Sequence, residues 1–112
     1  MDPGVQPDPI RARAQWDTLV ATIERLGGTV EAIAQREDAP DMVYAMNLGL
    51  GVETEDGRPH VVLSHMRYPQ RRMETASAEQ WFLERGFTTS YVGADGVGAH
   101  FEAGDAFAFG DA

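Results

Sequence analysis

Apolar residues recur at helical spacing near the start of the chain. In DPIRARAQWDTLVATIERLGG (residues 8–28), Asp8 can cap a helix, Pro9 suits its first turn, and the final pair of glycines supplies the stop. The apolar residues of this segment fall on one face: Trp16, Leu19, Val20, Ile23 and Leu26. The spacing predicts a helix with one apolar side, preceded by a flexible tail over residues 1–7.

From residue 29 the pattern becomes that of strands. TVEAIAQ (29–35) alternates apolar and polar residues, with one isoleucine out of phase, and predicts a strand. MVYAMNLGLGV (42–52) is apolar throughout except for one asparagine, and predicts a strand buried on both faces. HVVLSHM (60–66) predicts a further strand, and the Asp56-Gly57 turn before it predicts that the two strands form a hairpin.

The second half of the chain continues the alternation. In SAEQWFLERGF, Ser77 followed three residues later by Gln80 resembles a capping box, and Gly86 ends a short helix. The predicted elements are, in order, a polar connection (67–76), a helix (77–86), a strand (88–93), a flexible turn (93–99) and the start of another hairpin (101–109). Strands and a helix in this order predict an α/β fold in which one ββαβ unit ends and the next begins.

Composition narrows the class of protein. A chain of 112 residues makes one domain at most. Its net charge of −9 would repel a phosphate backbone, so we expect no nucleic-acid partner. No apolar run approaches the roughly 20 residues of a membrane span, and the acidic opening MDPGVQPDP is unlike a signal peptide, so we expect a cytoplasmic protein without a membrane partner. Because there is no cysteine, these residues contain no thiolate nucleophile or thiolate metal site.

Two segments carry side chains that suit a charged small molecule. In PDMVYAMNLGL, Asp41 and Asn47 would share one face of an extended strand and could hold a planar cation such as guanidinium. The alternative is that Asp41 ends a turn and Asn47 satisfies a backbone group. In MRYPQRRMET, the loop arginines Arg67, Arg71 and Arg72 could bind a carboxylate in two-point geometry. The alternative here is a solvated loop in which they pair with a nearby glutamate.

A third segment, HFEAGDAFAFGDA, places Glu102 and Asp105 beside small residues. A carboxylate there could orient a catalytic histidine or take part in proton transfer, and the alternative is a turn whose acids face water. The three histidines, His60, His65 and His100, lack the HxH or HxxxH spacing of metal ligands. No nucleotide or phosphate motif is present either, so we expect neither a metal nor a cofactor.

In register, the motifs PDMVYAMNLGL, VVLSHMRYPQRRMET with ERGF after it, and FEAGDAFAFGD resemble the amidinotransferase and arginine deiminase superfamily, which includes the dimethylarginine dimethylaminohydrolases. The resemblance runs from about residue 39 onwards. It implies ββαβ modules of a pentein-like α/β propeller, incomplete here, and a small guanidino compound as ligand. It also implies attack of a cysteine thiolate on the guanidine carbon, with a histidine as general acid and base.

The resemblance also implies roles for single residues. Glu102 would be the acid that supports the catalytic histidine. Asp41 and Asn47 match positions that contact the substrate guanidinium, and Arg71, with Arg72 as the alternative, matches the loop arginine that contacts the substrate carboxylate. Many hydrolase members have an acid where Asn47 stands, so this departure points to a transferase-like branch.

The family's catalytic histidine and cysteine lie beyond the FEAGD segment, so we expect residues 8–112 to be the N-terminal part of a longer propeller enzyme, inactive alone. Its exposed strand and helix face predict either a homodimer or pairing with a complementing C-terminal half. Two other functions stay open. One is a fragment of a dimethylarginine dimethylaminohydrolase-type hydrolase, and the other is a non-catalytic α/β binding module.

Overall fold

The computed structural model describes residues 6–92 and 99–107, which belong to two compact units, Met1–Ala32 and Ile33–Ala112. The elements follow in the order α1 (Pro9–Arg25), η1 (Pro40–Asn47), β1 (Gly49–Glu53), β2 (Pro59–Leu63), α2 (Pro69–Glu84), β3 (Thr88–Tyr91) and η3 (Ala103–Asp105), where η marks a 3-10 helix. The predicted tail over residues 1–7 lies largely outside the described residues.

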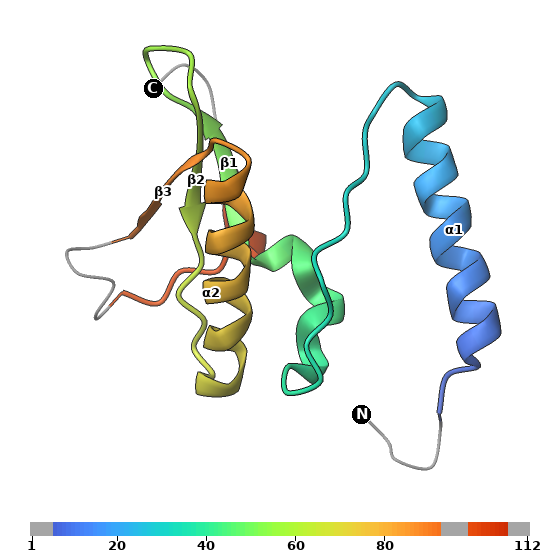
Figure 1. The fold of residues 1–112 in the computed structure, drawn as a ribbon. Helices are drawn as coiled ribbons and strands as arrows, with labels where there is room; N and C mark the ends of the chain where they lie inside the picture. The colour runs from blue at the N-terminus through green and yellow to red at the C-terminus, as the bar shows by residue number, and fades with distance from the viewer. Residues whose placement is uncertain (1–5, 93–98, 108–112) are drawn as a thin grey trace. The chain divides into compact units, whose positions relative to one another are not determined.

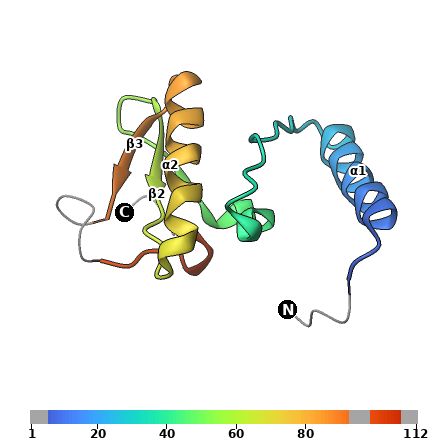
Figure 2. The same ribbon diagram turned by 60° about the horizontal axis from the view of Figure 1, so that its bottom comes forward.

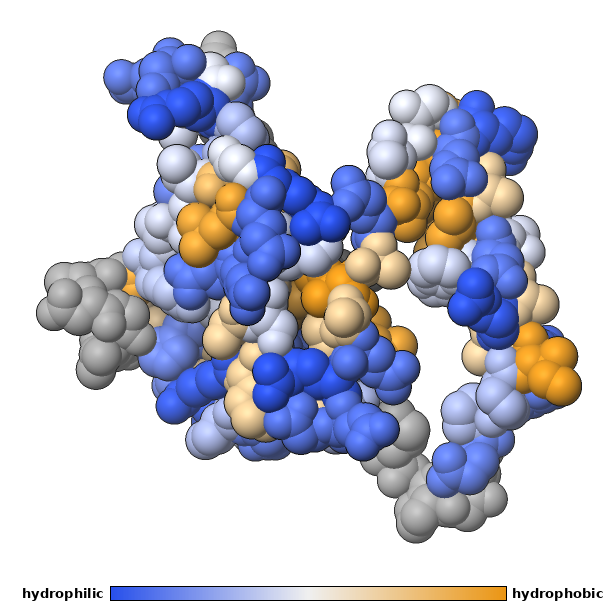
Figure 3. Space-filling model, viewed as in Figure 1, coloured by the Kyte–Doolittle hydropathy of each residue, from blue (hydrophilic) through white to orange (hydrophobic). Residues whose placement is uncertain are grey.

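The first unit consists of α1, which confirms the predicted helix. Asp8 caps it, because its Oδ1 accepts hydrogen bonds from the backbone N–H groups of Ile10 at 2.9 Å and Arg11 at 3.2 Å. After the last turn Gly27 adopts a φ of 90°, which favours glycine. No residue of α1 is buried, and Figure 3 shows apolar side chains at its surface. The large exposed ones are Ile10, Trp16, Leu19 and Ile23.

The second unit holds a three-stranded sheet in the order β1-β2-β3. β1 and β2 form the predicted antiparallel hairpin, and Gly57 in its turn has a φ of 75°. β3 is the predicted strand after the second helix, and it runs parallel to β2, with Val61 opposite Thr89. α2 forms the crossover between these parallel strands and lies along one face of the sheet (Figures 1 and 2). The order of elements is therefore ββαβ.

One predicted strand is wrong, and another is confirmed only in its second half. Residues 29–35 form no regular element, because the alternating pattern there meets no neighbouring strand with which to pair. Of the predicted strand over residues 42–52, the first part belongs to η1, and the strand β1 begins only at Gly49 and ends at Glu53. Val43 is 76% exposed while Leu48 is 2% exposed, so the continuous apolar run marks neither a two-sided strand nor a uniformly buried segment. Apolar runs of this length do not by themselves distinguish helix from strand.

α2 begins eight residues earlier than predicted. Pro69 occupies its first turn, so most of the expected polar connection is helical. Ser77 is therefore no cap: its hydroxyl lies in mid-helix and donates to the carbonyl of Met73 at 3.3 Å. The predicted end is confirmed, since Gly86 follows the helix with a φ of 81°.

The expected hairpin over residues 101–109 is also wrong where the structure describes it. Phe101 pairs with His65 in a single antiparallel bridge, and the chain then turns into η3 rather than extending as a strand. Small residues and an aspartate favour such a turn over a strand. The predicted flexible turn over residues 93–99 and the end of the hairpin lie almost entirely outside the described residues.

The core of the second unit lies between α2 and the chain segments that flank the β1–β2 hairpin. Leu48, Met66 and Ala78 are buried together, and Ile33 and Phe82 pack against them. Because Leu48 follows η1 and Met66 precedes α2, this cluster holds the ends of both elements in place. None of the helices in the described part of the chain has the length and apolar character that a membrane span requires.

Candidate functional site

The predicted site residues gather where η1, the segment after β2, the start of α2 and η3 meet. Asn47 and Glu102, which are 55 residues apart in the chain, are joined by a hydrogen bond of 2.7 Å from Asn47 Nδ2 to Glu102 Oε2. Asn47 Oδ1 accepts from the backbone N–H of Gly104 at 2.5 Å. Both ends of the amide are thus fixed by the FEAGD segment, and its donor end points at the carboxylate.

The close contact at Gly104 requires a glycine. A Cβ built at this position would fall 2.8 Å from Asn47 Oδ1, which is closer than side-chain carbons come to neighbouring atoms. The absence of a side chain lets the backbone of η3 reach the amide of Asn47.

Ser64 connects the end of η1 with η3 through its hydroxyl. It follows β2, is completely buried, and donates through Oγ to the carbonyl of Asn47 at 2.5 Å. The same Oγ accepts from the backbone N–H of Ala103 at 2.9 Å. One hydroxyl therefore links the end of η1 to the residue next to Glu102.

The second oxygen of Glu102 faces the start of α2. Glu102 Oε1 accepts from the backbone N–H of Arg67 at 3.3 Å, so each carboxylate oxygen has a donor. A carboxylate offers about four lone-pair positions, and the contacts of Glu102 within residues 6–92 and 99–107 use two of them.

Arg71 forms an ion pair with Glu74 one turn further along α2. Arg71 Nε lies 3.3 Å from Glu74 Oε1, and Arg71 Nη2 lies 3.1 Å from Glu74 Oε2. The side chain of Arg71 is 13% exposed and that of Glu74 is completely buried. The hydrogen bonds to Glu74 are the largest cause that raises the pKa of Arg71, while burial opposes the shift.

The charges of Glu102 and Asp41 also raise the pKa of Arg71. Asp41 is in the first turn of η1 and is half-buried. The prediction that Asp41 and Asn47 share a strand face is wrong, because they stand at the two ends of a 3-10 helix. The fold nevertheless brings both of them to the neighbourhood of one arginine and one glutamate.

Arg72 makes different contacts. Its Nε donates to the carbonyl of Met66 at 2.9 Å, and its Nη2 donates to the carbonyl of Arg67 at 3.3 Å. These bonds tie the loop after β2 to the first turn of α2. Of the two arginines proposed for a carboxylate, Arg71 is the one whose charge is coupled to the acids of the site.

The histidines lie at the edges of this arrangement. The rings of His65 and His100 are 5.4 Å apart, and His65 Nδ1 is buried with no hydrogen-bond partner among the described residues. His60 lies on the sheet between Thr88 Oγ1, at 2.7 Å, and Ser90 Oγ, at 2.8 Å. Among residues 6–92 and 99–107, no group of three or more metal-ligating side chains converges.

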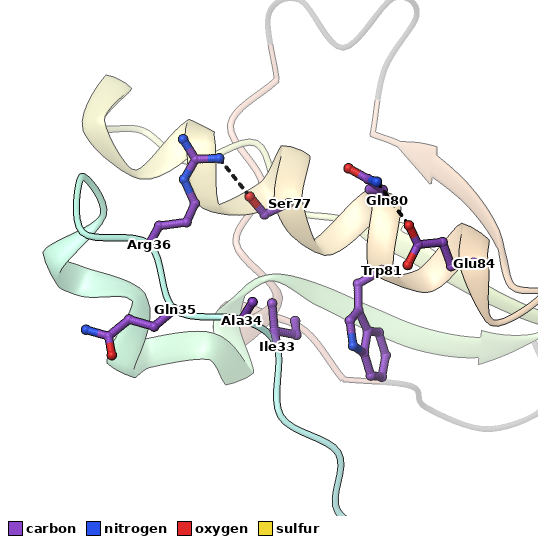
Figure 4. A pocket seen from close by; sticks show the side chains of 8 residues that line it. All are labelled: Ile33, Ala34, Gln35, Arg36, Ser77, Gln80, Trp81 and Glu84. Carbon is purple, nitrogen blue, oxygen red and sulfur yellow. Dashed lines mark hydrogen bonds between the residues drawn. The ribbon is translucent and has the colours of Figure 1, made fainter.

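A separate hollow of about 250 Å³ lies between α2 and the extended segment before η1. In Figure 4, Ile33, Ala34, Gln35 and Arg36 line one side, facing Ser77 and the rest of α2 on the other. Arg36 Nη1 donates to Ser77 Oγ at 3.1 Å across it. None of the predicted site residues lines this hollow.

Sequence patterns missed Ser64 and Gly104 as parts of the site, and treated Glu74 only as a loop partner of the arginines. The spacing of Arg71 and Glu74 would have placed them on one helix face had Pro69 been taken as a helix start. No local pattern could have shown that Ser64 meets Ala103, since that contact joins segments 39 residues apart.

No protein-family model matches the chain, but individual proteins do. A dimethylarginine dimethylaminohydrolase of Mycobacterium tuberculosis is 33% identical over 95 residues, which are 82% of this chain and 30% of that protein. The bifunctional arginine dihydrolase/ornithine cyclodeaminase ArgZ of Synechocystis is 35% identical over 78 residues, 70% of this chain and 10% of that protein. An uncharacterized protein of Caenorhabditis elegans is 31% identical over 93% of this chain and 34% of its own length.

Solved structures of related proteins also resemble this chain. The N-terminal domain of cyanobacterial ArgZ bound to substrate superimposes with a TM-score of 0.69 and 32% identity, over 85% of this chain and 32% of the other. AgrE in complex with L-arginine superimposes with a TM-score of 0.64 and 27% identity, over 85% of this chain and 13% of the other. The chain thus spans about a third, or less, of the length of these proteins.

Proposed function

This chain is related in sequence and fold to the N-terminal portion of the amidinotransferase, arginine deiminase and dimethylarginine dimethylaminohydrolase superfamily, and we propose that it provides the guanidinium-binding part of a guanidino-modifying enzyme. The observation that carries the proposal is the hydrogen bond between Asn47 and Glu102, together with the acids Glu102 and Asp41 whose charges both raise the pKa of Arg71. Two motifs distant in sequence supply these groups, PDMVYAMNLGL and FEAGD, and the resemblance assigns both to the site.

The balance of charge favours a cationic ligand. Asp41, Glu74 and Glu102 act on the single guanidinium of Arg71, and the direct ion pair of Arg71 is with Glu74. Asp41 and Glu102 are therefore the acids left to balance the charge of a ligand. A planar guanidinium can pair with a carboxylate through two parallel hydrogen bonds, which is the geometry that these acids can offer.

In the proposed roles, Asp41 and the amide oxygen of Asn47 contact the substrate guanidinium. Glu102 supports proton transfer, because its bonds to Asn47 and Arg67 use two of about four lone-pair positions of its carboxylate. Arg71 binds the carboxylate of the substrate, and Arg72 keeps the loop beside it in place through backbone carbonyls.

The proposed reaction needs a nucleophile that these 112 residues do not contain. A cysteine thiolate would form a bond to the guanidine carbon, an amine would leave with a proton, and the resulting amidino-type intermediate would pass to water or to an amine. With no cysteine in the sequence, the role proposed for this chain is to bind and orient the guanidino group. A pentein-like propeller, completed by further ββαβ modules, is the proposed setting for the thiolate.

Transfer to water is the better supported of the two outcomes. The relatives whose printed names state an activity are a dimethylaminohydrolase and an arginine dihydrolase, and both names describe hydrolytic chemistry. This favours the hydrolase alternative over the transferase-like branch that Asn47 indicated. A non-catalytic binding module built on the same site remains the other alternative, since binding itself does not require the thiolate.

Isothermal titration calorimetry with L-arginine, and with ornithine as a ligand that lacks the guanidino group, tests the proposal. We expect saturable millimolar binding of L-arginine, with Asp41→Asn and Asn47→Ala each weakening it by about tenfold, the effect of one charge-assisted hydrogen bond. Asp56→Asn is the matched control, since Asp56 lies in the hairpin turn and pairs with Arg58. Equal binding of both ligands, or equal loss in the control, would contradict a guanidinium site.

A further inference from the structure

We propose that Glu74 is a positioning residue that holds the guanidinium of Arg71 with one edge free, so that this edge receives the carboxylate of an amino-acid substrate. The inference rests on the proposed function, because it concerns the other end of the same ligand. It assigns to Glu74 the selection of a substrate that carries both a guanidino group and a carboxylate.

The first support is the way in which the ion pair uses the guanidinium. Glu74 accepts from Nε and Nη2 of Arg71, which form one side of the planar group. Arg71 Nη1 has no hydrogen-bond partner among the described residues. The end edge formed by Nη1 and Nη2 therefore retains donors, and a guanidinium end edge fits a carboxylate through two parallel bonds.

A second contact restrains the same group from another direction. The guanidinium carbon of Arg71 lies 5.8 Å from the centroid of the Tyr44 ring, within the range of a cation–π contact. Glu74 sets the rotation of the guanidinium in its plane, and Tyr44 restrains the plane itself. With both contacts made, the orientation of the free edge is defined before any ligand binds.

Burial of Glu74 is hard to explain by stability alone. Its side chain is completely buried, and its hydrogen bonds within the described part of the chain come from Arg71. Removing two charges from water costs about as much as their attraction returns, so apolar residues of similar size would stabilise the helix as well. A fixed direction for the guanidinium is what this pair supplies and an apolar pair would not.

Glu74 also keeps Arg71 away from the other acids. The charges of Asp41 and Glu102 attract Arg71, and these are the acids proposed to bind the guanidinium of the substrate. Without Glu74, the side chain of Arg71 would be drawn toward them and compete with the ligand. Loss of Glu74 should thus weaken all guanidino ligands somewhat, and weaken those with a carboxylate most.

The ratio of two affinities isolates the carboxylate. We would titrate the full chain by calorimetry with L-arginine and with agmatine, which has the same guanidino group and no carboxylate. The wild type is expected to prefer L-arginine by about tenfold or more, as charge-assisted bonds to a carboxylate would give. In Glu74→Gln this ratio should fall close to one. The ratio is unaffected by any loss that both ligands share.

Glu79→Gln is the matched control. Glu79 is on the same helix and also accepts two hydrogen bonds, from Thr89 Oγ1 and Tyr91 Oη at 3.2 Å each, and no hydrogen bond or ion pair joins it to Arg71. Its replacement perturbs the two hydrogen bonds between α2 and β3 and should leave the ratio as in the wild type. Circular dichroism confirms folding of each variant. If Glu74→Gln is unfolded, Glu74→Asp decides, since it keeps the charge but withdraws it by one methylene and should also lower the ratio.

The outcomes separate the two proposals. A wild-type ratio retained in Glu74→Gln or in folded Glu74→Asp overturns the positioning role, and so does an equal fall in Glu79→Gln. Wild-type binding of both ligands with equal affinity overturns it too, while the guanidinium site stands. Binding of neither ligand overturns the proposed function and this inference together.

Discussion

Replacement of Ser64 by alanine tests the junction on which the site depends. The hydroxyl of Ser64 is fully buried and makes two bonds, one to the carbonyl of Asn47 and one from the N–H of Ala103. Ser64→Ala keeps the Cβ and removes only the oxygen. No other described group accepts from the N–H of Ala103, so the variant leaves a buried donor without a partner.

The expected cost follows from that unpaired donor. Ala103 is 7% exposed, so water reaches its backbone poorly. A buried polar group without a partner costs about 1–3 kcal/mol, and we expect Ser64→Ala to lower the free energy of unfolding by about 2 kcal/mol. For a domain of this size, that loss corresponds to a fall in melting temperature of roughly 8–16 °C.

Urea unfolding followed by circular dichroism measures the loss, with Ser90→Ala as the control. The hydroxyl of Ser90 is exposed and bonds to His60 on the open surface of the sheet, so its removal should change stability by less than about 0.5 kcal/mol. If Ser64→Ala and Ser90→Ala have the same midpoint, Ser64 is not the link between η1 and η3 that the structure indicates.

Three further results are expected. Gly104→Ala should displace the Asn47 amide, because the added Cβ would fall 2.8 Å from Asn47 Oδ1, and calorimetry should show weaker L-arginine binding. The control Gly51→Ala, whose Cβ would have nothing within 4 Å, should bind L-arginine as the wild type does. Asp8→Ala should lower helicity by circular dichroism and cost α1 about 1 kcal/mol, since it removes the cap; unchanged hydrogen exchange at the first turn would contradict this. Burial, with the charge of Glu79 and its hydrogen bond, raises the pKa of Tyr91 to about 12 from 10.0. The stability that this protonated hydroxyl supplies is complete below pH 10 and is lost as the pH rises toward 12, so a tyrosinate absorbance titration should show one late phase that Tyr91→Phe removes.

Elements with a local signal could be predicted from the sequence. α1 has a capping residue and a glycine stop, and the hairpin between β1 and β2 has an aspartate-glycine turn. Each of these signals acts through neighbouring backbone groups, so no knowledge of distant segments is needed. β3 carries threonines and a tyrosine, residue types that favour strands.

Other elements depended on competition between signals. Pro69 and Ser77 both resemble helix starts, and Pro69 begins the helix because the residues between them are good helix formers. The apolar run around Asn47 fits either a strand or a helix, and tertiary packing of Leu48 decides the result. The lone strand pattern over residues 29–35 found no partner.

The candidate site, too, was predicted only in part from the sequence. Three motifs indicated the residues that meet at the candidate site, but the reasoning that placed Asp41 and Asn47 on one strand face was wrong. Their actual arrangement depends on contacts such as that of Ser64 with Ala103, which close loops of dozens of residues. Side-chain periodicity carries no information about such closures.

The side-chain amide of Asn47 gives the most direct test of the guanidinium site. In ¹⁵N-labelled protein, its two amide protons can be followed by NMR during titration with L-arginine, and with lysine as a ligand of equal charge but without a guanidino group. The account predicts saturable shifts of the Asn47 amide and of the Gly104 N–H with L-arginine, and none of comparable size with lysine. Resonances that stay in place at millimolar L-arginine, or that move equally with lysine, would contradict it.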